Sequence, residues 1–171
     1  MNYYFNIHPV QLLSYFDERV RKWCEQCKRF NQNSSCPPLI ESIDYYKNLI
    51  KNYDRGTLIV KKFIIEDIAS WKELGKESSE ELRYALLYLK NVLKVKNTLQ
   101  FGAGSCKYCD SCIYPCRFPD KRLISLEGIG INVVKLVSDI SFQYIKIKFP
   151  VEKYRYFYRI GLLLWRQDEK I

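Results

Sequence analysis

Four cysteines stand in one short segment of the chain, at the spacing C-x-x-C-x-x-C-x-x-x-C. They are Cys106, Cys109, Cys112 and Cys116. This compact spacing is typical of iron–sulfur binding loops, because two intervening residues let successive thiolates reach neighbouring iron atoms. Gly102 and Gly104 precede the cysteines and would allow the backbone to approach a cluster closely. The segment is therefore expected to fold around whatever its thiols bind.

The other three of the seven cysteines lie together in a second short stretch. They are Cys24, Cys27 and Cys36. An odd number of thiols cannot form a complete disulfide framework, and clustered cysteines in a reducing compartment more often bind metal. Lys28 and Arg29 would favour the ionised, ligating form of the thiols beside them. We expect folding to bring the two cysteine groups together around metal.

Two kinds of metal site suit these thiols. An iron–sulfur cofactor, as one or two 4Fe-4S clusters, would use the whole four-cysteine loop, or three of its cysteines with a remote fourth ligand such as Cys36 or Cys116. Zinc would instead pair two knuckles, Cys24-x-x-Cys27 and Cys106-x-x-Cys109, which leaves the remaining loop cysteines unexplained. A non-thiolate fourth ligand is also conceivable. His8 is the only histidine, but it precedes a proline and is more simply a helix-start residue.

The pattern of apolar residues predicts an α+β fold in a single domain, residues 1–171, with a small, mainly antiparallel sheet and about four helices. Alternating and β-branched segments predict strands at 2–7, 57–65, 98–101, 145–149 and 154–160. Spacings of three and four residues predict helices at 9–24, 38–53, 78–93 and 125–140, the third opened by a capping box of Ser78 and Glu81. Residues 66–77 are polar and are expected to form a connection or insertion.

Composition places the chain among proteins that fold without crosslinks. Of its 171 residues, 47% are hydrophobic and 15% aromatic, which is enough to bury a sizeable core. The start of the chain lacks a basic region and a small-residue cleavage site, and no apolar run is long enough to span a bilayer. We therefore expect a cytoplasmic protein without a membrane partner, whose cysteines bind metal or act in redox chemistry.

The formal net charge of +9 favours acidic partners, either an acidic redox protein or RNA, including the ribosome. The predicted C-terminal strands alternate basic and aromatic residues, and the candidate nucleic-acid contacts are Lys146, Lys148, Arg155 and Arg159. The same alternation is typical of a tyrosine-rich core face backed by a solvated basic face. We find no phosphate-binding glycine loop, catalytic Ser/His/Asp set or paired-carboxylate signature. The sequence therefore neither indicates nor excludes an enzymatic activity.

Motifs along nearly the whole chain resemble one family. They are Cys24-x-x-Cys27, Ser35-Cys36-Pro37-Pro38, the glycine-led loop from Cys106 to Cys116, Ser125-x-Glu127-x-x-Gly130-Ile131-x-Val133, and the closing segment from Tyr158 to Leu164. Together they resemble the small predicted metal-binding proteins grouped as domain of unknown function 2284. The resemblance implies a metal-binding protein of iron–sulfur type. Phe30-Asn31 stands where that family often has an aromatic residue followed by glycine.

The leading hypothesis is an iron–sulfur protein that serves electron transfer or a sulfur- or cofactor-related reaction. The alternative is a non-enzymatic, metal-stapled protein associated with RNA or the ribosome. The cysteine spacing supports the first hypothesis, while the positive charge and the basic tail support the second.

Overall fold

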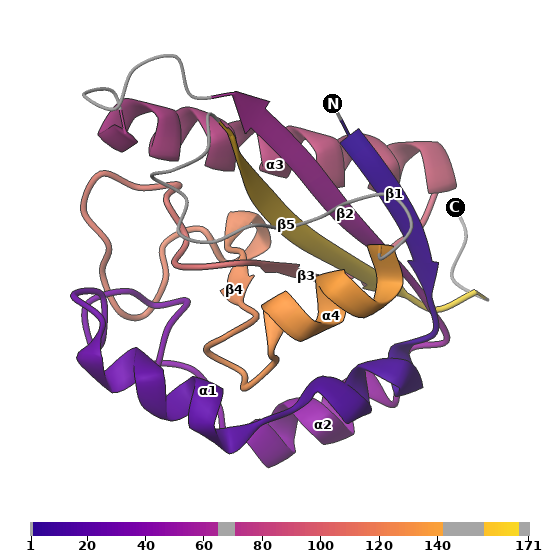
Figure 1. The fold of residues 1–171 in the computed structure, drawn as a ribbon, viewed down its shortest axis with the longest axis horizontal. Coiled ribbons are helices and arrows are strands. Elements are labelled where there is room, and N and C mark those ends of the chain that lie inside the picture. Colours follow the sequence, from indigo (N-terminus) through magenta and orange to yellow (C-terminus); the bar gives the residue numbers. More distant parts are fainter. Residues whose placement is uncertain (1, 65–70, 142–155, 168–171) are drawn as a thin grey trace.

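In the described part of the chain, residues 2–64, 71–141 and 156–167 of a computed structural model, five strands form one sheet (Figure 1). The strands are β1 (Asn2–Ile7), β2 (Arg55–Ile64), β3 (Leu99–Gly102), β4 (Ile124–Ser125) and β5 (Tyr156–Trp165). Their order is β1-β2-β5-β3-β4, and every neighbouring pair is antiparallel except β3 and β4. The α+β class and the mainly antiparallel sheet are thus confirmed.

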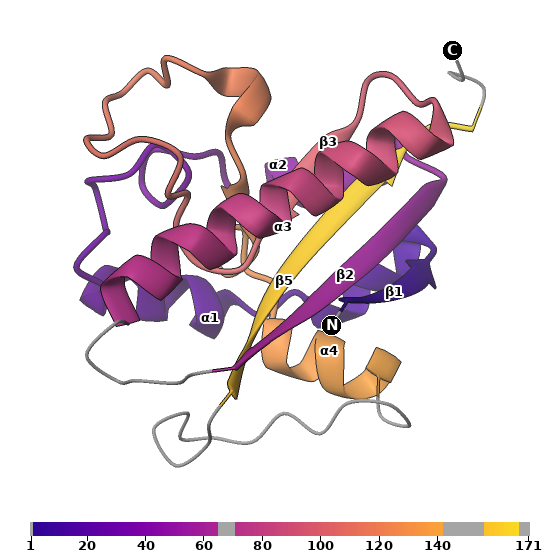
Figure 2. The same cartoon turned by 90° about the horizontal axis from the view of Figure 1, so that it is seen from above.

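The helices are α1 (Glu18–Trp23), α2 (Ile43–Ile50), α3 (Trp71–Leu93) and α4 (Val133–Ser141), with 3₁₀ helices at Pro9–Tyr15, Cys24–Gln26 and Pro119–Lys121. Helix α3 covers one face of the sheet, whereas α2 and α4 cover the other (Figures 1 and 2). On the α3 side, Leu82 and Leu86 pack with Leu163 of β5. On the opposite side, Phe101 of β3 is fully buried and meets the ring of Tyr46 edge-on. None of the helices within the described ranges is long and apolar enough to cross a membrane.

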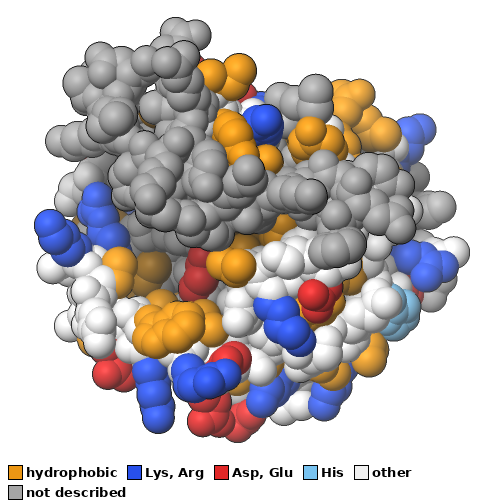
Figure 3. Space-filling model, in the orientation of Figure 1, with side chains coloured by type: hydrophobic (Ala, Val, Ile, Leu, Met, Phe, Trp, Pro, Cys, Tyr) orange, Lys and Arg blue, Asp and Glu red, His pale blue; other side chains and the backbone are white. Residues whose placement is uncertain are grey.

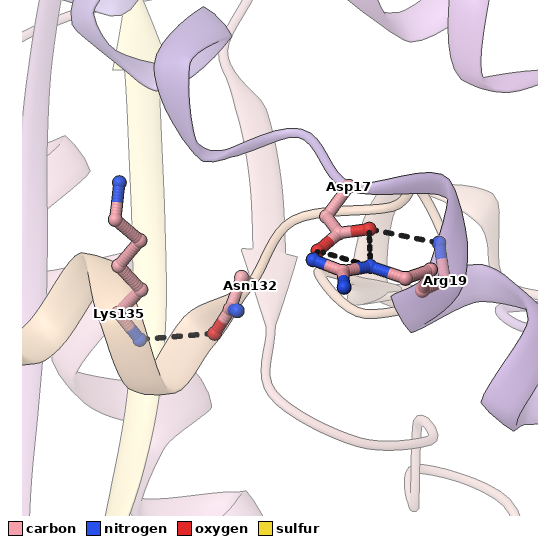
Figure 4. A network of polar contacts seen from close by, with 4 residues as sticks. All are labelled: Asp17, Arg19, Asn132 and Lys135. Atoms are coloured by element: carbon pink, nitrogen blue, oxygen red, sulfur yellow. Dashed lines mark hydrogen bonds and ion pairs between the residues drawn. The ribbon is translucent and has the colours of Figure 1, made fainter.

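The helix predicted at 9–24 is interrupted. Its first part is 3₁₀ helical, and α1 begins only after Asp17, whose backbone is extended. The Asp17 carboxylate accepts a hydrogen bond from the backbone N–H of Arg19, 2.9 Å away, and also binds the Arg19 guanidinium (Figure 4). Such a cap satisfies an N–H group that the first turn cannot pair internally. His8 caps the 3₁₀ helix through its Nδ1 atom, which confirms its helix-start role.

Helix α4 also starts later than predicted, at Val133 instead of Ser125. The amide oxygen of Asn132 accepts a hydrogen bond from the N–H of Lys135 at 3.0 Å and so caps the helix (Figure 4). Before it, Gly130 has φ of +94°, and a Cβ atom there would lie 2.9 Å from the Cδ1 atom of Ile43. This left-handed glycine cannot belong to a helix, which explains why residues 126–130 form turns.

Helix α3 begins at Trp71, seven residues before the predicted capping box at Ser78. The hydroxyls of Ser78 and Ser79 instead donate to the carbonyl oxygen of Gly75 within the helix. Residues 71–77 are therefore helical, while 66–70 lie outside the described residues. The predicted strand at 145–149 also lies outside them, and β5 runs past the predicted end at residue 160 to Trp165.

Candidate metal centre

The two cysteine-bearing stretches meet at one end of the sheet. The chain that follows α1 and the chain that follows β3 lie side by side there in both ribbon views (Figures 1 and 2). Asn33, which is 5% exposed, donates from Nδ2 to the carbonyl oxygen of Cys106 at 2.9 Å. The N–H of Cys106 in turn donates to the hydroxyl of Ser35 at 2.9 Å. Hydrogen bonds therefore join the early cysteine stretch to the first cysteine of the later one.

Asn33 also shapes its own turn. Its Oδ1 atom accepts hydrogen bonds from the backbone N–H of Ser35, 3.0 Å away, and from the Ser35 hydroxyl, 2.6 Å away. The carbonyl oxygen of Ser35 accepts from the N–H of Ser125 in β4 at 3.0 Å. The turn that carries these polar groups is consequently tied both to the cysteine loop and to the edge of the sheet.

Three cysteines of the loop line one pocket of about 590 Å³. They are Cys106, Cys109 and Cys112. The sulfur of Cys112 lies 3.3 Å from the backbone nitrogen of Ser34, whose N–H donates to it, and 3.3 Å from the Ser34 hydroxyl. Hydrogen bonds to ligand sulfurs orient the thiolates of iron–sulfur sites and tune their reduction potential. Cys116 is half-buried but is not among the residues that line this pocket.

Positive charge surrounds the same pocket. Arg29, Lys76 and Lys107 all line it. Burial lowers the pKa of Lys107, and the neighbouring charges of Arg159 and Arg29 lower it further. Lys76 forms an ion pair with Asp110 of the loop at 2.8 Å, which links α3 to the loop. Cations next to thiols favour the thiolate form that ligates metal.

The three early cysteines line a different pocket, of about 240 Å³. Cys27 is exposed and Cys24 half-buried, whereas Cys36 is 8% exposed. Burial raises the pKa of the Cys36 thiol to about 11, and the negative charges of Cys24, Cys27 and Glu127 add to this effect. The structure thus places these three thiols in one pocket, and Arg29 lines both this pocket and that of the loop cysteines.

Glu127, which belongs to the motif Ser125-x-Glu127 and was not among the predicted site residues, also lines this second pocket. Its Oε2 atom accepts hydrogen bonds from the N–H of Gly104 at 2.8 Å and from the hydroxyl of Ser125 at 3.2 Å. Burial raises the pKa of its carboxyl group. Because Gly104 opens the cysteine loop, Glu127 ties that loop to the early thiols, and only the motif Ser125-x-Glu127 pointed to it.

The donor chemistry of both pockets fits a thiophilic metal centre, since each offers thiols and nearby hydrogen-bond donors or cations. Within the described residues, no three Cys, His, Asp or Glu side chains are grouped closely enough to hold a metal ion as they stand. Ligation would therefore require the cysteine side chains to turn toward one another. All seven cysteines are free thiols available for this.

The structure describes only one of the four candidate nucleic-acid contacts. Lys146, Lys148 and Arg155 lie outside the described residues, so their role stays a prediction. Arg159 is held against α3, where its guanidinium donates to the Ser78 hydroxyl at 2.8 Å and to the Gly75 carbonyl at 3.1 Å. Figure 3 shows one face of the molecule. On the part of this face that is not drawn in grey, basic side chains are spread out with acidic ones among them.

Asn31 occupies the position where the resembling family often has glycine. Its φ is +54°, in the left-handed region that favours glycine and tolerates asparagine. Its N–H donates to the carbonyl oxygen of Pro37 at 3.0 Å and closes the turn that leads to Cys36. Asparagine at this position therefore adopts a backbone conformation that is also open to glycine.

Replacing Asn31 by valine is expected to destabilise the protein by about 1 to 3 kcal/mol, because a β-branched residue is strained at positive φ. Asn31→Gly should leave stability unchanged or raise it slightly. Chemical denaturation measures both effects, and Asn6→Val, at an exposed position of β1, is the matched control. Equal stability of Asn31→Val and Asn6→Val would contradict the assigned backbone conformation.

Comparison with known proteins places this geometry in a family context. No curated protein and no solved structure matches the chain. One family model, described as a predicted metal-binding protein, matches residues 13–164 and so includes all seven cysteines and Glu127. The chain belongs to this family of predicted metal-binding proteins, DUF2284.

Proposed function

We propose that this protein is an iron–sulfur protein that carries electrons, with a 4Fe-4S cluster held by the loop cysteines Cys106, Cys109, Cys112 and Cys116. The observation that carries this proposal is the shared pocket of the first three, where the N–H of Ser34 donates to the sulfur of Cys112. Thiols at this spacing with an amide donor on a sulfur are characteristic of cluster ligation. The family assignment supports a metal of some kind.

The grouping of three loop cysteines in one pocket supports iron–sulfur over zinc. A structural zinc site would pair Cys24 and Cys27 with Cys106 and Cys109 around one ion. These two knuckles line different pockets, whereas three of the loop cysteines share one, which supports a site centred on the loop. The early cysteines are better assigned to a second site of their own.

The cluster, when bound, would supply one-electron transfer, and the chain's own residues would adjust its environment. Ser34 would donate to a ligand sulfur, while Arg29 and Lys107 would offset the negative charge of the thiolates. The same cations would complement an acidic redox partner that approaches the pocket. A sulfur- or cofactor-related reaction would use the same site if its substrate entered this pocket. The reducing cytoplasm is the compartment that keeps such thiols free.

Metal and sulfide analysis tests the proposal directly. Protein purified without oxygen is expected to be brown and to contain iron together with acid-labile sulfide. Colourless protein that holds zinc alone, even after anaerobic cluster reconstitution, would contradict the iron–sulfur assignment.

A further inference from the structure

The guanidinium of Arg83 in α3 contacts the ring of Tyr108 and forms no ion pair among the described residues. Its Nε and Nη2 atoms are buried and have no hydrogen-bond partner within the described residues. A buried guanidinium nitrogen without a partner is unfavourable, because the group has lost its contacts with water and gained none in return. Such a group indicates either a strained position or a partner that is bound there.

A pocket of about 470 Å³ surrounds this side chain, between α3 and the cysteine loop. Its volume lies in the range of small-molecule sites. Tyr84, Leu87 and Tyr108 form its apolar wall. The first two are unusually exposed for large apolar residues, at 71% and 51%. An organic ligand would cover this apolar surface.

Positive charge converges on one ring of the pocket. The Cζ atom of Arg83 lies 4.7 Å from the centre of the Tyr108 ring, and the Nζ atom of Lys121 lies 5.3 Å from it. Lys121 also donates to the Tyr108 hydroxyl at 3.0 Å, and Lys90 lines the same pocket. Cations brought together repel one another, and a bound anion would relieve this repulsion.

Two acidic residues, Glu80 and Asp120, line the pocket as well. Neither forms an ion pair with Arg83 among the described residues, so neither neutralises it. Their charges would repel a polyanion. The pocket therefore favours a ligand that has a single anionic group and a flat apolar part.

We propose that this pocket binds a small organic anion, with its carboxylate or phosphate group on Arg83 and Lys121 and its apolar part against Tyr84, Leu87 and Tyr108. Arginine suits both anionic groups, because its planar fork of donors matches their oxygen atoms. Tyr108 lies between Cys106 and Cys109 in the chain, so the ligand would contact the cysteine loop itself. The site does not depend on which metal the loop holds.

Calorimetric titration of the purified, metal-loaded protein tests the site, with phenyl phosphate and benzoate as probes. Saturable binding of either is expected, and the tighter one identifies the anionic group. Arg83→Gln should weaken that binding about tenfold or more, as expected for hydrogen bonds to a charged group. Lys96→Gln, which removes an exposed charge outside the pocket, should leave it unchanged.

Lys121→Gln provides a second variant at an exposed position, where misfolding is not a concern, and should weaken binding several-fold. The proposal would be overturned if neither probe binds, or if Arg83→Gln and Lys96→Gln bind equally well. Tighter binding of pyrophosphate than of phenyl phosphate would overturn the preference for one anionic group. Iron and sulfide measured on the same samples report separately on the cluster, so either proposal can fail alone.

Discussion

Replacing Cys112 by serine is expected to lower the iron and acid-labile sulfide content of the protein at least about tenfold, since even changes behind a metal ligand reduce affinity about 10- to 100-fold. Cys112 lines the loop pocket, and its sulfur accepts the N–H of Ser34. A serine hydroxyl cannot replace a soft, easily ionised thiol as an iron ligand. The measurement is metal and sulfide analysis of anaerobically purified variant and parent protein.

Cys27→Ser is the matched control, because it makes the same chemical change in the other pocket. Since Cys27 is exposed there, the variant should fold and retain the loop's iron and sulfide. If the two variants lose iron to the same extent, the seven thiols serve one shared centre, and the assignment of separate sites is wrong.

Replacing Asn33 by alanine is expected to destabilise the protein by about 2 to 4 kcal/mol. Each buried hydrogen bond contributes about 1 kcal/mol, and a buried partner left without its hydrogen bond adds to the loss of stability. Its side chain takes part in three such bonds, one to the Cys106 carbonyl and two from Ser35. The melting temperature should fall by roughly 5 to 15 °C. Thermal unfolding followed by circular dichroism measures this change.

Asn91→Ala, at an exposed position of α3, is the control and should leave the melting temperature nearly unchanged. Asn33→Ala should also release bound iron faster than the parent protein, since it unlinks the two cysteine stretches. If Asn33→Ala proves as stable as Asn91→Ala, the hydrogen bond from Asn33 to Cys106 contributes nothing to the stability of the fold.

The strands were predictable because their signal is local. Alternating and β-branched residues identified β1, β2 and β3 to within about two residues. Helix starts were less predictable, because the same serine can cap a helix or bond within it. Ser78 looked like a cap, yet α3 starts at Trp71. The turn before Ser78 is held by contacts from distant parts of the chain, such as the one from Arg159 to the Gly75 carbonyl, which no local signal shows.

The cysteines were predicted to be ligands from their spacing alone, and that role stays a prediction, whereas their division between two pockets was not predictable. That division depends on how the turn at Asn33 sits against the loop, which is a contact across 73 residues. The place of Glu127 in the site could not be predicted, because a single carboxylate has no characteristic spacing. Arg83 could not be identified from the sequence either, because a guanidinium without hydrogen-bond partners is recognised only when its burial and its neighbours are known.

The parallel pairing of β3 with β4 has a consequence for how the cysteine loop is held. Gly102 and Ser125 are paired neighbours in the sheet, and the whole cysteine loop runs between them. The entropy lost in bringing the ends of a long segment together is therefore offset by the pairing of these two strands. The sheet joins the two ends of the loop, so metal binding would have only to order the residues between them.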